Sequence, residues 1–199
     1  MISSRAFKYT IIGLLVVVSV ASWYFTISIY QNNKADIITA VADIAHELAL
    51  PFHMARMAAR EPVTELPVPV YGVVLDQIDD TWGAARSEGR THDGTDIFAT
   101  RGTPVFSATE GYVTRTNIGT RGGINVMVAG PGGLNYYYAH LERIADGIRR
   151  GQAVTTDTVL GFVGNSGNAT NTPPHLHFAL YPERWDAVNP YPLLVDRWD

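Results

Sequence analysis

The chain of 199 residues contains no cysteine, which removes several kinds of site at once. Neither a disulfide framework nor a thiolate ligand can be built, so a metal site would need histidine, aspartate or glutamate. Basic residues are not in excess: 15 lysines and arginines stand against 19 aspartates and glutamates, a formal net charge of −4. This balance lacks the basic footprint of nucleic-acid binding, so no nucleic-acid partner is expected.

Charge is also absent from the run YTIIGLLVVVSVASWYFTISIY, residues 9–30. As a helix, this run is long enough to cross a bilayer core of about 30 Å, and it predicts a single transmembrane signal anchor. The alternative is a cleaved signal peptide, with the small residues 19–21 as a weak cleavage site. Because the apolar run continues past residue 21, the anchor is the favoured interpretation.

The charges beside the run predict its orientation. Arg5 and Lys8 precede it, whereas Lys34 and Asp36 offset one another after it. The positive-inside rule therefore predicts residues 1–8 in the cytoplasm and everything after Tyr30 on the outer side of the cytoplasmic membrane, in periplasmic or extracellular space.

A helical stalk is predicted over residues 31–61. The apolar residues at helical spacing are Ile37, Val41, Ile44 and Leu48. Pro51 is expected to interrupt the helix, with a second short helical piece through Ala59. The apolar stripe offers a face for self-association or for covering an active-site groove. His46 and His53 have no partner pattern and are interpreted as ordinary polar-face or packing histidines.

Residues 62–79 are interpreted as a proline-rich linker and entry to a domain over residues 80–199. In that domain, short runs of β-branched and aromatic residues alternate with Gly, Pro and Asn. The candidate strands are residues 103–108, 111–116, 124–130, 134–141, 159–164 and 175–181. The sequence GPGG at 130–133 predicts a hairpin turn. The fold class is therefore mainly β, a compact antiparallel sheet domain.

Two histidines one residue apart lie in TPPHLHFALY, residues 172–181. Because side chains alternate along a strand, His175 and His177 should share one face, with Leu176 and Phe178 on the other. Taken alone, such a pair is more often two surface histidines on a half-exposed strand.

A second candidate pair lies in the sequence THDGTDIF, where His92 and Asp96 flank a turn containing Gly94. An imidazole and a carboxylate at this spacing can reach one metal ion. The plain alternative is a turn aspartate beside a solvated histidine.

His140 ends the aromatic run NYYYAHL, and strict alternation would place it on the same face as Tyr136 and Tyr138. Zinc catalysis needs three protein ligands and one open position. His92, Asp96 and one histidine of H-x-H meet that count, and they leave a formal charge of +1 that polarises a substrate carbonyl. The remaining histidines could take the proton from water or stabilise the oxyanion.

Four motifs in this order resemble the lysostaphin-type, or LytM-type, zinc metallopeptidases, which cut peptide bonds in bacterial peptidoglycan. The resemblance runs from about residue 80 to about residue 194. It rests on DTWGAARSEGRTHDGTDIFATRGTPVFSATEGYV, YYYAHL, GQAVTTDTVLGFVGNSGNAT and PPHLHF. It implies a lysostaphin-like antiparallel β core, of the duplicated hybrid motif type, with the site in a groove bounded by loops.

The resemblance also implies roles for five residues. His92, Asp96 and His177 would bind one zinc ion per chain, while His140 and His175 would flank the water and the scissile carbonyl. Two departures bear on substrate choice. Ala179 follows H-L-H-F where many relatives carry glutamate, and the family's aromatic wall near the zinc is not evident in the sequence, although Gly83 and Arg86 match a G-x-x-R opening.

The implied function is a membrane-anchored zinc endopeptidase that hydrolyses stem peptides or cross-bridges of peptidoglycan. Two alternatives stay open. One is a catalytically silent scaffold that binds the cell wall or activates a separate amidase, and the other is a peptidase of exported proteins. The expected partners are peptidoglycan peptides, the membrane through residues 9–30 and, through the stalk, a second copy of the chain.

Overall fold

The computed structural model describes residues 4–86, 89–182 and 186–198, without the side chains of residues 4–17 and 32. The chain divides into two compact units, Met1–Ala45 and His46–Asp199. The second unit contains every candidate site residue.

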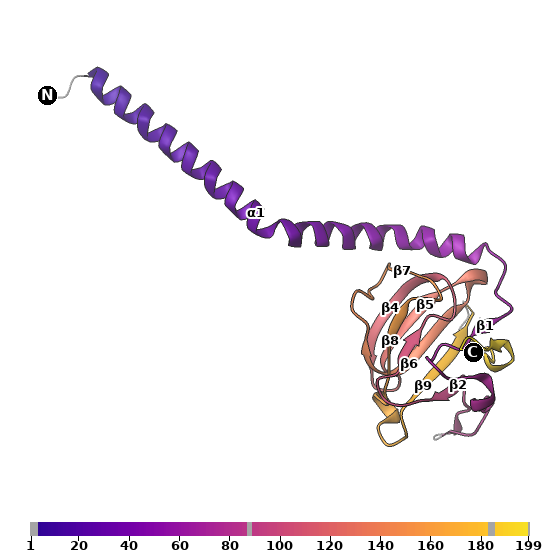
Figure 1. Cartoon of the computed structure of the whole chain (residues 1–199). Coiled ribbons are helices and arrows are strands. Elements are labelled where there is room, and N and C mark those ends of the chain that lie inside the picture. The colour runs from indigo at the N-terminus through magenta and orange to yellow at the C-terminus, as the bar shows by residue number, and fades with distance from the viewer. Residues whose placement is uncertain (1–3, 87–88, 183–185, 199) are drawn as a thin grey trace. The chain divides into compact units, whose positions relative to one another are not determined.

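The first element is one helix, α1 (Ser4–Ala58), which continues through Pro51 (Figure 1). The predicted interruption at Pro51 is therefore wrong. Contacts on both sides of the proline explain why the helix persists. Leu50 is buried, the Glu47 carboxylate accepts hydrogen bonds of 2.7 and 2.9 Å from Nε of Arg150, and the His53 ring stacks on Tyr112 with centroids 4.2 Å apart. These contacts offset the roughly 3 kcal/mol penalty of an internal proline, and they confirm a packing role for His53.

Within the part of the chain that the structure describes, no helix is both long and apolar enough to cross a membrane. Residues 9–17 of the predicted anchor belong to α1, but their side chains lie outside the described part. The anchor over residues 9–30 stays a prediction.

The second unit is built on an antiparallel sheet of eight strands (Figure 1). Six of the strands pair side by side in the order β2-β9-β6-β5-β4-β7. Strand β8 pairs with β6 and also with β3. The strands are β2 (Thr95–Phe98), β3 (Pro104–Phe106), β4 (Gly111–Gly119), β5 (Gly123–Ala129), β6 (Asn135–Ile144), β7 (Ala153–Val154), β8 (Val159–Val163) and β9 (His175–Tyr181). Short 3₁₀ helices are η1 (Leu75–Gln77), η3 (Pro131–Gly133), η4 (Gly167–Ala169) and η5 (Tyr191–Leu193). The mainly β antiparallel class is confirmed, and a strand is present within each of the six predicted runs.

The segment predicted as a linker contributes to the core instead. Leu66, Val68 and Val70 are fully buried. Strand β1 (Leu66–Pro67) pairs in parallel with β10 (Leu194–Val195), and the amide of Val68 donates to the carbonyl of Val195 at 3.0 Å. The apolar residues at every second position explain the burial, because an extended segment directs them all to one side. The compact unit therefore begins well before residue 80.

Strand β9 separates the core from the candidate site. Leu176 and Phe178 are fully buried, and the Phe178 ring lies 5.2 Å from that of Tyr138 between ring centroids. His175 and His177 alternate with them and face the other side of the sheet. The predicted alternation in H-L-H is confirmed.

Candidate metal centre

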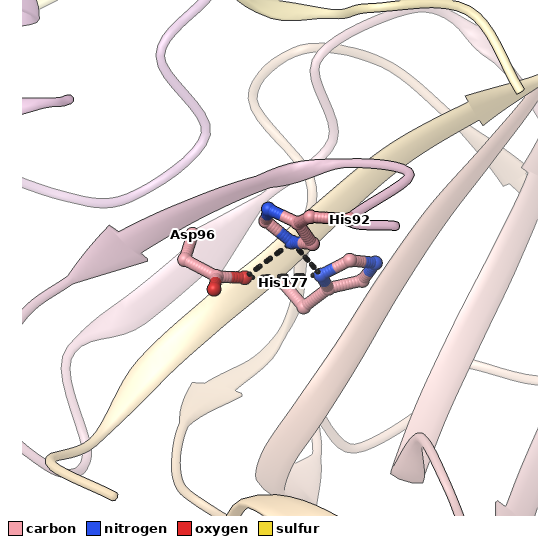
Figure 2. A group of neighbouring side chains, drawn as sticks. All are labelled: His92, Asp96 and His177. Carbon is pink, nitrogen blue, oxygen red and sulfur yellow. Dashed lines mark hydrogen bonds and ion pairs between the residues drawn. The ribbon is translucent and has the colours of Figure 1, made fainter. Parts of the chain in front are cut away.

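Three side chains from two segments meet at one point (Figure 2). His92 precedes β2, Asp96 lies on β2, and His177 lies on β9 directly opposite Asp96 in the antiparallel register. Nε2 of His92 lies 3.0 Å from Nδ1 of His177 and 3.1 Å from Oδ1 of Asp96. Nδ1 of His177 lies 3.0 Å from Oδ1 of Asp96. The structure thus brings together the two ends of the H-x-x-x-D motif and the second histidine of H-L-H.

Backbone and side-chain contacts aim these donor atoms. Nδ1 of His92 is 2.9 Å from the carbonyl oxygen of Thr81, so it carries the proton and leaves the Nε2 lone pair directed at the cluster. Oδ2 of Asp96 accepts a 2.5 Å hydrogen bond from Nη2 of Arg86, which leaves Oδ1 for the cluster. On the far side of the His177 ring, Nε2 lies 3.9 Å from Oδ1 of Asp93.

Gly94 is required by the close approach of the ligand turn to β9. A Cβ at this position would lie 2.6 Å from Cε1 of His177 and 2.7 Å from the carbonyl oxygen of Phe178. Only glycine lets the turn carrying His92 pack against the ring that completes the cluster.

Asp96 stays ionised in this setting. Burial alone would raise the pKa of its carboxyl group, but the His177 and His92 rings beside Oδ1 hold that pKa well below its usual range. A buried carboxylate that accepts several hydrogen bonds favours its charged form. Asp96 therefore supplies an anionic oxygen between two imidazoles.

The other two predicted histidines lie beside the cluster. Nδ1 of His140 is 2.8 Å from the carbonyl oxygen of Ser166, and Nδ1 of His175 is 2.9 Å from that of Pro173. Each ring therefore keeps Nε2 as its basic nitrogen. Nε2 of His175 is 3.9 Å from Oδ1 of Asp96, and the His140 and His177 ring centroids are 5.8 Å apart. Burial is the main cause that lowers the pKa of His140 to about 4, so its ring is neutral at pH 7.

The predicted facing of the aromatic strand is wrong. Tyr136 and Tyr138 are buried in the core, away from His140, while Tyr137 faces the site. His140 breaks the alternation because its φ is +62°, in the left-handed region, and the β5–β6 register shifts there. This conformation is uncommon for a residue other than glycine, and it turns the imidazole to the site face.

The Gly-rich connection at residues 163–170 supports His140. Besides its carbonyl contact with His140, Ser166 accepts a hydrogen bond from the amide of Ile124 at 2.9 Å and donates one to the carbonyl of Leu141 at 2.7 Å. Gly123 permits the approach, since a Cβ there would lie 2.2 Å from Oγ of Ser166. This loop positions His140 beside the cluster.

The cluster opens into a cavity of about 530 Å³. Tyr137 packs edge-on against His177 with centroids 6.3 Å apart, Tyr181 lies 6.2 Å from Tyr137, and the exposed Phe98 ring lies 5.1 Å from His175. All three rings line the cavity, and the sequence did not reveal that they lie beside the histidines. Four arginines also line the cavity, namely Arg86, Arg90, Arg115 and Arg121. Sequence reasoning noted only Arg86, for its place in G-x-x-R, and missed the other three.

The donor set fits a metal ion. Two donors with bonds of about 2.0–2.1 Å in a tetrahedral zinc site lie roughly 3.3 Å apart, close to the observed 3.0–3.1 Å. The side chains of His92 and Asp96 are 3% and 9% exposed, so the donors are withdrawn from water. His92, Asp96 and His177 are compatible with one metal site.

Similar proteins support the same interpretation of the fold. The L-Ala–D-Glu endopeptidase of Bacillus subtilis strain 168 is 40% identical over 125 residues, which cover 57% of this chain and 38% of that protein. The solved catalytic domain of the antimicrobial peptidase lysostaphin from Staphylococcus simulans aligns with a TM-score of 0.53 and 25% identity, over 59% of this chain and 92% of that domain. A zinc-containing peptidase from Vibrio cholerae aligns with a TM-score of 0.51 and 25% identity, over 64% of this chain and 39% of that chain.

The match spans well under half of the Bacillus relative's length, so the likeness concerns only a part of that protein. The family model for peptidase family M23 matches residues 90–190, which include all five predicted site residues. The resemblance drawn from the four ordered motifs is confirmed: the chain belongs to peptidase family M23.

Proposed function

We propose that the chain is a zinc-dependent endopeptidase of peptidoglycan in which His92, Asp96 and His177 hold the metal. The observation that carries the proposal is the triangle of donor atoms with sides of 3.0–3.1 Å, next to two further imidazoles in the same cavity. Two nitrogens and one carboxylate would also suit ferrous iron. Membership of a peptidase family and the likeness to a zinc-containing peptidase favour zinc.

When bound, the zinc ion would supply Lewis acidity toward water and the scissile carbonyl. The residues of the chain would do the rest. His140 is neutral at pH 7, so its free Nε2 can accept a proton from the attacking water. His175, held by the Pro173 carbonyl, would stabilise the developing oxyanion or return the proton to the leaving amine. The edge-on Tyr137 ring would limit access of bulk water.

Peptidoglycan peptides are the proposed substrate because of the relatives. The Bacillus relative is named for the bond between L-Ala and D-Glu, and a Vibrio cholerae relative is named a peptidoglycan DD-endopeptidase. These names describe different bonds, so the proposal extends to peptide bonds of stem peptides or cross-bridges. A peptidase of exported proteins would use the same five residues.

The test is mass-spectrometric product analysis of defined muropeptides with purified full-length protein. We expect zinc-dependent release of new peptide ends, loss of release with a chelator and recovery with added zinc. His177→Ala serves as the negative control. A protein that holds no zinc and releases no product, yet stimulates a separate amidase, would instead support the scaffold alternative. Cleavage of an unrelated protein with no muropeptide cleavage would support a peptidase of exported proteins.

Membrane attachment is proposed from the sequence alone. The uncharged run at residues 9–30 supports an anchor with the catalytic unit outside the cytoplasmic membrane. Alkaline extraction of membranes, with protease added to intact spheroplasts, would test it: an anchored chain resists extraction and its catalytic unit is digested. Release into the soluble fraction would contradict the anchor. Self-association through the exposed stripe around Val41 and Ile44 is testable by crosslinking in the same membranes.

A further inference from the structure

One wall of the cavity carries two arginines that the proposed mechanism does not use. Arg115 lies on β4 and Arg121 lies in the turn between β4 and β5, and both are exposed and line the cavity. Neither forms an ion pair with the residues that the structure describes. By contrast, Arg86 is paired with Asp96. Four arginines line the cavity against two aspartates, Asp93 and Asp96, so this groove is locally positive although the net charge of the chain is −4.

A β-bulge directs Arg115 into the groove. In β4, Val113 pairs with the core residue Val128, but the next paired residue is Arg115, opposite the cavity-lining Met127. Without the extra residue Thr114, Arg115 would share the core-facing side of Val113. Bulges beside active sites commonly re-aim a side chain in this way.

The bulge is held by its neighbours. The carbonyl of Thr114 accepts a 2.9 Å hydrogen bond from Nη1 of Arg150, and the carbonyl of Val113 accepts one of 2.8 Å from the amide of Gly151. The direction of Arg115 is therefore built into the fold.

Arg121 flanks the opposite end of the same wall. Its carbonyl accepts a 3.0 Å hydrogen bond from the amide of Asn168 in the loop that positions His140. The adjacent Gly122 accepts a 2.8 Å hydrogen bond from the His140 amide. Arg121 is thus tied to the backbone of the proposed catalytic histidine.

The sheet register gives the distance from this wall to the cluster. Arg115, Met127, Tyr137 and Ala179 form one row across β4, β5, β6 and β9. Three strand spacings of about 4.8 Å separate Arg115 from β9, on which His177 lies one pleat away. The backbone of Arg115 therefore lies about 14 Å from β9, which is the length of roughly four residues of extended peptide. The arginine side chain reaches across part of this distance, so fewer residues of the peptide can suffice.

From this arrangement, and resting on the proposed function, we infer that Arg115 and Arg121 form a carboxylate-binding subsite that selects acidic peptides. The recognised carboxylates lie two to four residues from the scissile carbonyl. Guanidinium groups bind carboxylates with two parallel hydrogen bonds, whereas a carboxamide offers only one acceptor and no charge. Free peptide carboxylates are therefore preferred over amidated ones.

The experiment compares two soluble muropeptides that differ only in whether their peptide carboxylates are free or amidated. For the zinc-loaded full-length protein we expect kcat/KM to be about 10- to 100-fold higher on the free form, mostly through KM. In the double variant R115Q/R121Q this ratio falls to near one, while zinc content stays equal to that of the wild type. The variant R115K/R121K recovers part of the preference.

Arg143→Gln provides the matched control, because Arg143 lies over the Phe162 ring outside the cavity and its loss should leave the preference intact. The inference is overturned if the wild type cleaves both muropeptides equally, or if R115Q/R121Q keeps the wild-type ratio. Cleavage of neither muropeptide by zinc-loaded wild type would instead refute the proposed function, and the subsite with it.

Discussion

Replacing Gly94 by alanine should weaken metal binding without unfolding the protein. The added Cβ would lie 2.6 Å from Cε1 of His177, whereas ordinary contact begins at 3.4 Å. The Phe178 carbonyl, 2.7 Å away, belongs to a buried strand paired with β2 and cannot retreat easily. The imidazole of His177 must therefore move by about 0.8 Å, well beyond the tolerance of about 0.2 Å for metal–ligand distances.

A displaced ligand of this kind should lower zinc affinity about 10- to 100-fold, or about 1.4 to 2.7 kcal/mol. The assay is competition of the metal-free protein with a chromophoric zinc chelator, which requires no substrate. Gly119→Ala is the matched control, because a Cβ there would meet only the Asn117 side chain at 3.7 Å. Thermal unfolding of both variants in chelator checks that they fold. Equal zinc affinity of the two variants would refute the role of Gly94 in positioning His177.

Three further predictions concern single side chains of the site. Arg86→Gln removes the 2.5 Å contact that orients Asp96 and should lower zinc affinity several-fold. Arg86→Lys should retain part of the zinc affinity. Equal zinc affinity of the wild type and both variants would contradict this role of Arg86. His175→Ala should keep one zinc per chain by elemental analysis but lower kcat at least about a hundredfold, and loss of the metal would make His175 a ligand instead. The pKa of His140 is lowered to about 4 in the folded protein, so the unfolded chain takes up this proton more readily. The free energy of unfolding is therefore highest above about pH 6.5 and falls by about 3 kcal/mol as the pH drops to 4. In urea unfolding of chelator-treated protein, His140→Asn should lose less stability than the wild type over that pH range. Asparagine is suitable here because it tolerates the positive φ of this position. An identical loss in both proteins would contradict the lowered pKa of His140.

The sequence predicted the parts of the site that follow from local patterns. Alternation along a strand places His175 and His177 on one face, and the four-residue spacing of His92 and Asp96 allows both to reach one metal ion. The strands and the GPGG turn follow from apolar runs and turn residues. Each of these features depends on residues close together in the chain.

The features that could not be predicted break the local pattern. The left-handed backbone of His140 and the bulge at Thr114 reverse which side chains face the site, and no composition signal marks either residue. Pro51 stays helical because of contacts between its helix and distant residues of the sheet unit, Tyr112 and Arg150. The prolines on both sides of Val68 predict a linker, whereas Val68 is buried and pairs with the C-terminal segment, which no local pattern indicates.

The most direct test of the proposed metal site is a crystal structure with anomalous diffraction measured on both sides of the zinc absorption edge. We expect one zinc peak per chain, bonded to Nε2 of His92, Oδ1 of Asp96 and Nδ1 of His177, with His140 and His175 outside the bonding distance. A peak bonded to His175 or His140 in place of His177, or no zinc peak at this cluster in zinc-loaded protein, would contradict it.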